Sequence, residues 1–219
     1  MMLFRAPGVY RPQFDTALLM QAAEAAVVPA GGQVLDVGTG SGALTVAALR
    51  FGAQRVTAMD ISRRALLSVW LNSLRWPGRV ELLHGDIRHV RPRDRYDLVL
   101  ANPPYVPAPA ADGAARSARA WAGGPSGRAV LDPLCALLPQ LLRESGTGLI
   151  VQSVLSDPVR TIEILDTGGL NAEITARGTV AFGPVLRSRL AWLEAAELIM
   201  PGQRDEELVV IRARHRRVR

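Results

Sequence analysis

Residues 33–42 read QVLDVGTGSG, and this stretch decides the fold. Its first five residues are mostly apolar, as expected for a strand inside a sheet. Gly38, Gly40 and Gly42 then form a pattern that permits a tight turn and lets the backbone approach a ligand closely. Apolar residues at helical spacing follow over 41–51. The stretch therefore predicts a strand, a glycine loop and a helix whose first N–H groups point at the ligand.

Alternating strands and helices are predicted downstream of this unit. Strand-like runs cover 54–59, 79–84, 96–101 and 148–154, and helical spacing covers 62–74 and 130–143. Strand, helix and strand recurring at about 20 to 25 residues indicate parallel βαβ units with right-handed crossovers.

The C-terminal part is predicted to close the sheet with an antiparallel hairpin. A helix is expected near 158–167, strands over 172–180 and 206–213, and a helix over the sheet edge between those strands. The fold class is thus α/β, a Rossmann-like doubly wound sheet of seven strands, mostly parallel with an antiparallel last strand.

Composition places the chain among ordinary globular proteins. Of its 219 residues, 48% are hydrophobic and 21% are charged, and no apolar run approaches the roughly 18 residues that span a bilayer. We therefore expect a cytoplasmic protein without a membrane segment. Cys135 is the sole cysteine and there are three histidines, too few for a disulfide framework or a zinc site, so no metal is expected.

The net charge of +6 is concentrated at the C-terminus. Residues 212–219 read RARHRRVR and hold five arginines, which leaves the remainder nearly neutral. We expect one domain over 1–211, with a helical lead-in over 1–30, and a basic tail over 212–219. A terminal arginine cluster is usually a solvated tail, and contact with a nucleic acid or an acidic partner is the alternative.

Asp36 indicates what the glycine loop binds. Gly38, Gly40 and Ala43 also fit the dinucleotide fingerprint G-x-G-x-x-[GA], and a glycine turn without a ligand is a further alternative. A carboxylate repels a pyrophosphate but attracts the ammonium and sulfonium groups of S-adenosyl-L-methionine. Asp36 therefore favours this cofactor, bound at Gly38, Gly40 and Gly42.

Two further acids follow the next two predicted strands. Asp60 ends the run VTAMD, where a carboxylate can accept both ribose hydroxyls, and Ile61 beside it is expected to line the same site. Asp86 is placed to accept from the adenine amino group, while Ile87 packs on the ring. A single Asp at a strand end is often only a helix N-cap, but three at one sheet edge predict a cofactor site.

The most informative four residues are Asn102, Pro103, Pro104 and Tyr105, directly after the fourth predicted strand. The prolines fix φ and carry no N–H, so they present rigid carbonyl oxygens without a competing donor. The side-chain oxygen of Asn102 and the carbonyl of Pro103 are expected to accept one hydrogen each from a planar NH2 group. Tyr105 is expected to lie on the flat face of that substrate. A proline turn without a ligand is the alternative.

With this NPPY motif the sequence resembles the class I S-adenosylmethionine-dependent methyltransferases. The motif is shared by N6-adenine methyltransferases of DNA and RNA and by the HemK/PrmC family, which methylates the glutamine amide in the GGQ loop of peptide-chain release factors. The chain is most similar to the short HemK branch that lacks the N-terminal helical domain, over nearly its whole length. The resemblance implies a release-factor-like protein substrate and, as often in eukaryotic cells, a small zinc-binding activator subunit.

Segments outside the shared fold carry this resemblance. GVYRPQFDTALL (8–19) is similar to the entrance motif of the branch, which implies that Thr16 touches the cofactor. The matching residues are Tyr10, Pro12, Asp15 and Thr16. Arg11 and Phe14 depart from the pattern, since this branch usually has an acidic residue at the second position.

A low-complexity stretch over 106–129 follows the NPPY motif, and its composition is typical of a mobile loop at the substrate side of an α/β sheet. Within it, AWAGGPSGRAVLD (120–132) resembles the substrate-side loop of the branch. Trp121 and Arg128 are therefore expected to bind the substrate together with Pro104 and Tyr105. EELVVIRA resembles the closing strand of the wider family.

Methyl transfer chiefly requires that a nitrogen be aligned with the methyl group and that water be excluded. Asn102 is the expected catalytic residue, assisted by the Pro103 carbonyl and Tyr105. The leading hypothesis is a protein-glutamine N5-methyltransferase acting on a release factor. The alternatives are an N6-adenine methyltransferase on RNA or DNA, a small-molecule N-methyltransferase and a cofactor-binding module without activity.

Overall fold

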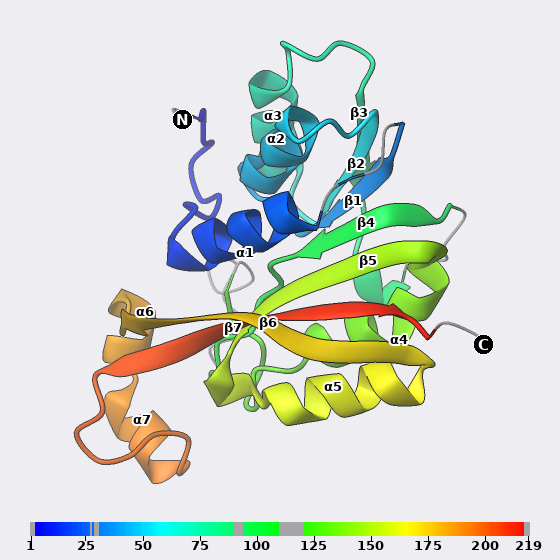
Figure 1. Cartoon of the computed structure of the whole chain (residues 1–219). Helices are drawn as coiled ribbons and strands as arrows, with labels where there is room; N and C mark the ends of the chain where they lie inside the picture. The colour runs from blue at the N-terminus through cyan, green and yellow to red at the C-terminus, as the bar shows by residue number, and fades with distance from the viewer. Residues whose placement is uncertain (1–2, 27, 29–30, 90–93, 110–120, 217–219) are drawn as a thin grey trace.

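A mixed seven-stranded sheet forms the centre of the molecule (Figure 1). The computed structural model describes residues 3–26, 28, 31–89, 94–109 and 121–216. The strands lie in the order β3-β2-β1-β4-β5-β7-β6. Their bounds are β1 Gln33–Val37, β2 Arg55–Asp60, β3 Val80–His84, β4 Tyr96–Ala101, β5 Leu142–Ser153, β6 Leu170–Ala181 and β7 Asp205–His215.

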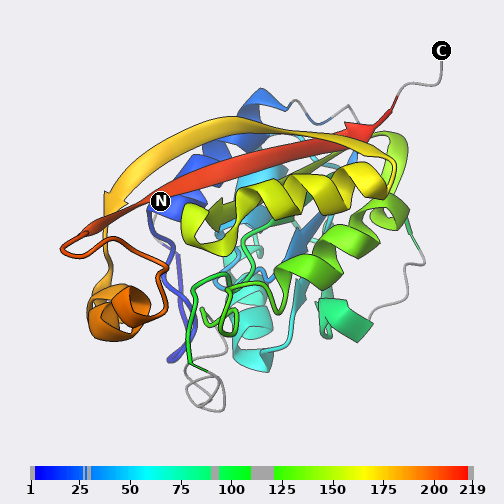
Figure 2. The same ribbon diagram turned by 90° about the horizontal axis from the view of Figure 1, so that it is seen from below.

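Helices cover both faces of the sheet. One group of helices lies on one face and a second group on the other, as the two views show (Figures 1 and 2). The first group is α1 (Phe14–Ala25), α2 (Ala43–Arg50) and α3 (Arg63–Asn72), and the second is α4 (Leu131–Leu141) and α5 (Pro158–Thr167). Short helical turns complete the chain: η1 (Ile87–His89), η4 (Val154–Ser156), α6 (Pro184–Arg187) and α7 (Leu190–Ala195).

The first five strands in sheet order run parallel, so their carboxyl ends meet at one edge. Asp36 in β1 is aligned with Ala58 in β2 and with Leu100 in β4, and the residues after these strands therefore share the same edge. The interior is apolar: Val34 and Leu100 are fully buried. Burial of such side chains on both faces is typical of a parallel sheet covered by helices.

The closing strands confirm the predicted antiparallel end of the sheet. β7 lies between β5 and β6 and is antiparallel to both. It extends to His215, so the strand includes four residues that we expected in a basic tail beginning at 212. Arg212 pairs with Glu173 at 2.5 Å, and Arg214 donates to the Thr147 hydroxyl at 2.9 Å. These two arginines therefore belong to the folded sheet, and the predicted boundary at 211 is too early.

The segment between β6 and β7 forms two short helices, α6 and α7, where one was expected. They pack on a second apolar cluster that includes Phe182, Leu186 and Leu193. Val106, just past the NPPY motif, packs against this cluster, so the two helices stand beside the motif. In the described ranges no helix is long and apolar enough to cross a membrane.

Candidate functional site

The glycine loop between β1 and α2 adopts a backbone that requires glycine. Gly38, Gly40 and Gly42 all have positive φ angles, of 70°, 55° and 81°. A Cβ at Gly42 would also come within 3.2 Å of the Val69 side chain in α3. The Gly40 N–H donates to Asp60 Oδ2 at 3.0 Å, which ties the loop to the end of β2. The loop is thus held rigidly at the edge where the parallel strands end.

Asp36 lies directly beneath this loop and is fully buried. Its Oδ2 accepts from the Thr39 hydroxyl at 2.7 Å and from the Thr45 hydroxyl at 2.6 Å. Its Oδ1 is buried without a hydrogen-bond partner among the described residues. Burial raises the pKa of Asp36 to about 6, although the two hydroxyls oppose the shift. A buried carboxylate oxygen that lacks a donor suits a positively charged ligand.

Thr39 and Thr45 were missed by the sequence analysis. Both threonines contact the same oxygen of Asp36, from the loop and from the first turn of α2. The sequence signal that could have identified Thr45 is its position in the first turn of the helix after the glycine loop, nine residues after Asp36. From there its side chain points toward Asp36.

Asp60 stands at the end of β2, where sequence analysis placed it. Its Oδ1 accepts from the Ser62 N–H at 2.8 Å and its Oδ2 from the Gly40 N–H. Burial raises the pKa of Asp60 despite these two donors. Each carboxylate oxygen retains a second lone pair, so Asp60 can still accept from ribose hydroxyls. The neighbouring Ile61 is 44% exposed, which leaves an apolar side chain available at this edge.

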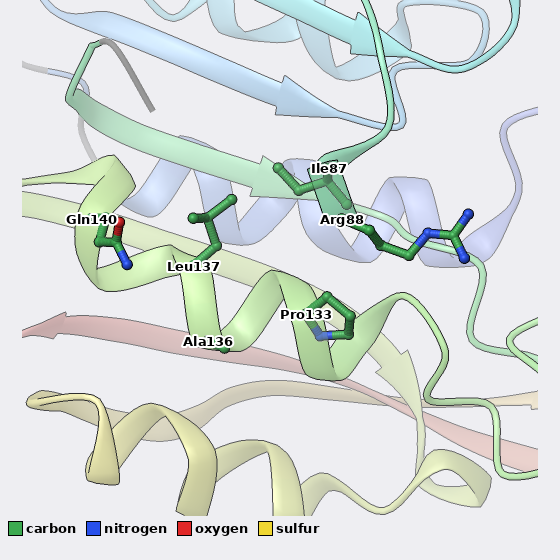
Figure 3. Close-up of a pocket in the computed structure, with 6 residues that line it drawn as sticks. All are labelled: Ile87, Arg88, Pro133, Ala136, Leu137 and Gln140. Carbon is green, nitrogen blue, oxygen red and sulfur yellow. The ribbon is translucent and has the colours of Figure 1, made fainter. Parts of the chain in front are cut away.

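Asp86 does not stand free at the end of β3. Arg88 pairs with it, with Nη2 at 2.5 Å from Oδ2, and the hydrogen bond from Arg88 lowers the pKa of Asp86. Ile87 is buried and borders a hollow of about 210 Å³ between η1 and α4. Figure 3 shows the six lining residues, among which Leu137 faces the hollow from α4. Contact of Asp86 and Ile87 with adenine stays a prediction. It requires the Asp86 carboxylate to accept from the adenine amino group while it remains paired with Arg88.

Asp15 connects the entrance segment to the NPPY motif. It is buried in the first turn of α1, and its Oδ2 accepts from three side chains. Asn102 Nδ2 donates at 3.0 Å, the Tyr105 hydroxyl at 3.2 Å and the Tyr10 hydroxyl at 2.9 Å. Its Oδ1 accepts from the Thr16 N–H at 2.6 Å. The carboxylate is therefore saturated by donors of this chain.

This arrangement fixes the orientation of the Asn102 amide. Its Nδ2 also lies 3.3 Å from the Thr16 hydroxyl, so both amide hydrogens have acceptors within the protein. The amide oxygen is then the group left to accept from a ligand. Burial and the charge of Asp15 raise the pKa of Tyr10 and of Tyr105, so both phenols stay protonated and can donate. Asp15 matched the entrance motif, but the sequence did not predict its contact with Asn102.

The substrate-side loop packs directly on the NPPY motif. A Cβ at Gly127 would clash with the carbonyl oxygen of Tyr105, and Gly127 has a φ of 72°. Pro103 and Tyr105 are buried, whereas Pro104 is half-buried. Residues 110–120 of the predicted mobile loop lie outside the described residues.

Arg128 occupies a different place from the one expected. Its side chain is buried, and its guanidinium pairs with Asp132 at 2.7 Å. It also donates to the backbone carbonyls of Ser156 and Asp157 and to the Thr161 hydroxyl. These contacts hold the loop against the start of α5, so Arg128 positions the loop in this structure. Four of its five guanidinium hydrogens are used in this way. Contact with the substrate stays a prediction, for which one hydrogen is left.

Trp121 lies at the other end of the loop. The guanidinium carbon of Arg189, just before α7, is 4.5 Å from the centre of the Trp121 ring. A cation over an aromatic ring contributes about 0.5 to 1 kcal/mol at exposed sites. The contact links the substrate-side loop to the α6–α7 segment, and Trp121 is half-buried there.

Glu206 at the start of β7 is a further buried acid that the sequence analysis did not single out. It is 8% exposed, and its Oε2 has no partner in the described part of the chain. Burial raises its pKa, with a contribution from the charge of Asp15. Its position in a closing strand gave no signal beyond an acid at the strand start.

A mostly parallel seven-stranded sheet with one antiparallel strand inserted near its end, a glycine loop after β1 and acids at the strand ends define the class I S-adenosylmethionine-dependent methyltransferases. Residues 1–117 match the model of the family described as "Methyltransferase small domain", and the chain belongs to this family. S-adenosyl-L-methionine is its cofactor.

Individual proteins are similar to this chain over most of its length. The "Release factor glutamine methyltransferase" of Mycolicibacterium smegmatis is 33% identical over 200 residues, covering 84% of this chain and 69% of that protein. The human "Methyltransferase HEMK2" is 34% identical over 172 residues, covering 74% of this chain and 79% of that protein.

A solved structure shows the same fold. The E. cuniculi Mtq2–Trm112 complex, whose description assigns it the methylation of the eRF1 translation termination factor, contains a chain with a TM-score of 0.64 to this one. The two chains are 23% identical, and the match covers 95% of this chain and 99% of the other.

Proposed function

We propose that this chain transfers a methyl group from S-adenosyl-L-methionine to the side-chain amide nitrogen of a glutamine in a release-factor protein. The orientation of Asn102 carries the proposal, because Asp15 and Thr16 take both hydrogens of its amide and leave the oxygen for the acceptor. The relatives named release factor glutamine methyltransferases support the choice of a glutamine amide. A protein substrate used in translation would place the enzyme in the cytoplasm.

The cofactor site is proposed at the ends of β1, β2 and β3. The unpartnered Oδ1 of Asp36 fits the positive charge of the methyl donor, which supplies an electrophilic methyl group when bound. Asp60 and Ile61 would hold the ribose side, Asp86 and Ile87 the adenine side, and Thr16 would touch the donor end. Gly38, Gly40 and Gly42 would let the backbone approach it.

The acceptor side is proposed at the NPPY motif. An amide nitrogen is a poor nucleophile because its lone pair is delocalised, so acceptors aimed at its hydrogens stabilise the charge that develops on nitrogen. The Asn102 oxygen and the Pro103 carbonyl would fill this role, while Tyr105 and Pro104 would bound the substrate. Trp121 would lie at the outer side of the acceptor site.

Site mapping by mass spectrometry tests the proposed function. Recombinant release factor is incubated with the enzyme and deuterated cofactor, and the modified residue is identified in proteolytic fragments. We expect one methyl group on the glutamine of the GGQ loop and none on a variant with alanine at that position. Transfer to the alanine variant, or no transfer to the wild-type factor, would contradict the proposal.

A nucleic-acid partner is not proposed. Arg212 and Arg214 form part of β7, and Arg216 donates to the carbonyl oxygen of Leu170 at 3.1 Å. These arginines are used within the fold, whereas the RNA or DNA alternative was based on the NPPY motif together with an arginine tail that contacts nucleic acid. Residues 217–219 lie outside the described residues.

A second subunit is proposed to cover α3. Leu67, Trp70 and Leu74 are each about half exposed. Leu67 and Trp70 share one face of α3 at a spacing of three residues, Leu74 lies in the turn just after α3, and α3 packs on the edge strand β3. An apolar stripe of this kind is typical of an interaction surface. The similar fold of the Mtq2–Trm112 complex supports a small activator as the partner. Co-purification with such a subunit, lost in a Trp70→Glu variant, would test this.

A further inference from the structure

Glu206 lies at the same edge of the sheet as Asn102. β7 runs antiparallel to β5, and Leu208 is aligned with Ser153 at the carboxyl end of β5. Glu206 is two residues nearer the start of β7, beyond the residue that pairs with Ser153. Because the carboxyl ends of β4 and β5 meet at this edge, the acid stands on the acceptor side of the sheet.

The Glu206 carboxylate has one oxygen that no donor among the described residues reaches. Two buried side-chain oxygens lack a partner in the described residues, Asp36 Oδ1 and Glu206 Oε2. Leaving a buried acceptor without a donor is costly, so binding of a molecule that brings a donor to such an atom is favoured. Asp36 serves the cofactor side, so Glu206 requires a donor on the other side.

The neighbours of Glu206 belong to the acceptor site. Burial raises the pKa of Tyr10, of Tyr105 and of Glu206, the charge of Glu206 adds to the shift of both tyrosines, and the charge of Asp15 adds to that of Glu206. The two phenols already donate to Asp15, as does Asn102. Among the described residues these three donors are therefore engaged at Asp15, and a bound molecule can supply the donor that Glu206 lacks.

We propose that Glu206 is an acceptor-binding residue, which takes a hydrogen bond from an N–H group of the substrate and, with Asp15, favours an uncharged amide over a carboxylate. The inference rests on the proposed function and deepens it. Asn102 and Pro103 take the two hydrogens of the glutamine amide, so the donor to Glu206 is a backbone N–H of the substrate loop. A glutamate in place of the glutamine would bring a third negative charge beside two buried carboxylates. Such like-charge repulsion is a common source of specificity.

Binding measurements with Glu206→Gln test the proposal. Titration calorimetry with S-adenosylhomocysteine present measures the Kd for recombinant release factor and for its Gln→Glu variant at the GGQ loop. We expect Glu206→Gln to weaken binding of the wild-type factor about tenfold or more and to narrow its preference over the Gln→Glu variant. The Kd for S-adenosylhomocysteine alone should stay unchanged.

Glu207→Gln is the matched control, because Glu207 is the next residue of the same strand and pairs with Arg177 on the opposite face of the sheet. It should leave both affinities unchanged. If the enzyme binds the release factor but Glu206→Gln binds it equally well, the inference is overturned and the proposed function stands. If wild-type enzyme neither binds nor methylates the factor, the proposed function and this inference both fall.

Stability of the ligand-free protein gives an independent readout. Removing an unsatisfied buried charge should raise the Tm of Glu206→Gln by about 2 to 4 °C, since the oxygen has no donor to lose. A purely structural role for the acid predicts the reverse. A lowered Tm would therefore overturn the inference even if binding of the release factor were weaker.

Discussion

Asp15 determines how Asn102 can act, because it accepts from the Asn102 amide, from Tyr105 and from Tyr10 at one oxygen. Replacing it with asparagine puts an amide where these donors converge. Hydrogen bonds to charged groups contribute about 1.5 to 3 kcal/mol. We therefore expect Asp15→Asn to lower kcat about 10- to 100-fold in steady-state assays with release factor.

Glu24→Gln is the control for this variant, since Glu24 is exposed on the same helix, α1. Its kcat should equal that of the wild type. An Asp15→Asn enzyme with a kcat within twofold of the wild type would show that the orientation of Asn102 does not depend on Asp15.

Asp36 predicts a pH dependence of cofactor binding. Burial raises its pKa to about 6, and the positive charge of S-adenosylmethionine favours the ionised form. Calorimetric titration should therefore show affinity about tenfold weaker at pH 5 than at pH 7, since the ligand-free carboxyl is mostly protonated at the lower pH. Asp36→Asn should bind more weakly at pH 7 and lose much of this dependence. An equally steep profile in the variant would contradict the assignment.

The raised pKa of Asp36 also makes the stability of the ligand-free fold depend on pH. The folded-state pKa lies above the ordinary value of 3.8, so the ligand-free protein binds this proton more tightly than the unfolded chain does. The resulting stability is fully present below about pH 4 and is lost as the pH rises through about 6. Asp60 and Glu206, whose pKa values are also raised by burial, act in the same direction. Asp36→Asn should accordingly have a higher Tm than the wild type at pH 8 when no cofactor is present, as thermal denaturation can measure.

The sequence predicted site residues where a local pattern marked them. Asp36 is the penultimate residue of β1, just before the glycine loop, and Asp60 is the last residue of β2, so their positions follow from the strands alone. The contact between Asp15 and Asn102 joins residues 87 apart, and no local pattern contains it. The sequence likewise did not predict that Arg128 contacts Asp132 and the start of α5, because these contacts depend on how the loop folds back.

Among the elements of the site, the loop after the NPPY motif supports Tyr105, because Gly127 of this loop packs against the Tyr105 backbone. A Cβ there would meet the Tyr105 carbonyl, and the φ of 72° disfavours other residues. We expect Gly127→Ala to destabilise the protein by about 2 kcal/mol, lowering the Tm by about 4 to 8 °C, and to reduce turnover. Thermal denaturation and a methyl-transfer assay measure the two effects.

Gly183→Ala provides the comparison, because a Cβ at Gly183, just before α6, meets nothing within 4 Å and φ there is −67°. It should change neither the Tm nor turnover. Equal effects of the two substitutions would show that Gly127 does not support the motif.

The elements themselves were predicted closely where apolar runs are bounded by turn residues. β1 and β4 have the predicted bounds, and α5 spans the predicted residues. Differences arise where tertiary contacts extend or divide an element. β7 continues to His215 because its backbone pairs with β6 up to Leu170, and this pairing includes residues whose charges resemble a tail.

At the scale of the whole molecule, the sheet brings three separate parts of the chain to one edge. The glycine loop and the NPPY motif meet there because β1 and β4 are parallel neighbours, and the entrance helix α1 packs beside them. The sequence predicts the parallel sheet, but the placement of α1 on it comes from contacts such as Phe14 against Gly178 of β6. This placement puts Asp15 beside Asn102.

The single-turnover rate of Asn102→Ala shows whether the Asn102 oxygen aims the acceptor nitrogen at the methyl group. Enzyme saturated with labelled cofactor is mixed with recombinant release factor, and the label on the factor is followed over time. If the Asn102 oxygen aims the acceptor nitrogen, the rate constant falls about 100-fold or more while the factor still binds. A rate constant equal to that of the wild type would contradict the account.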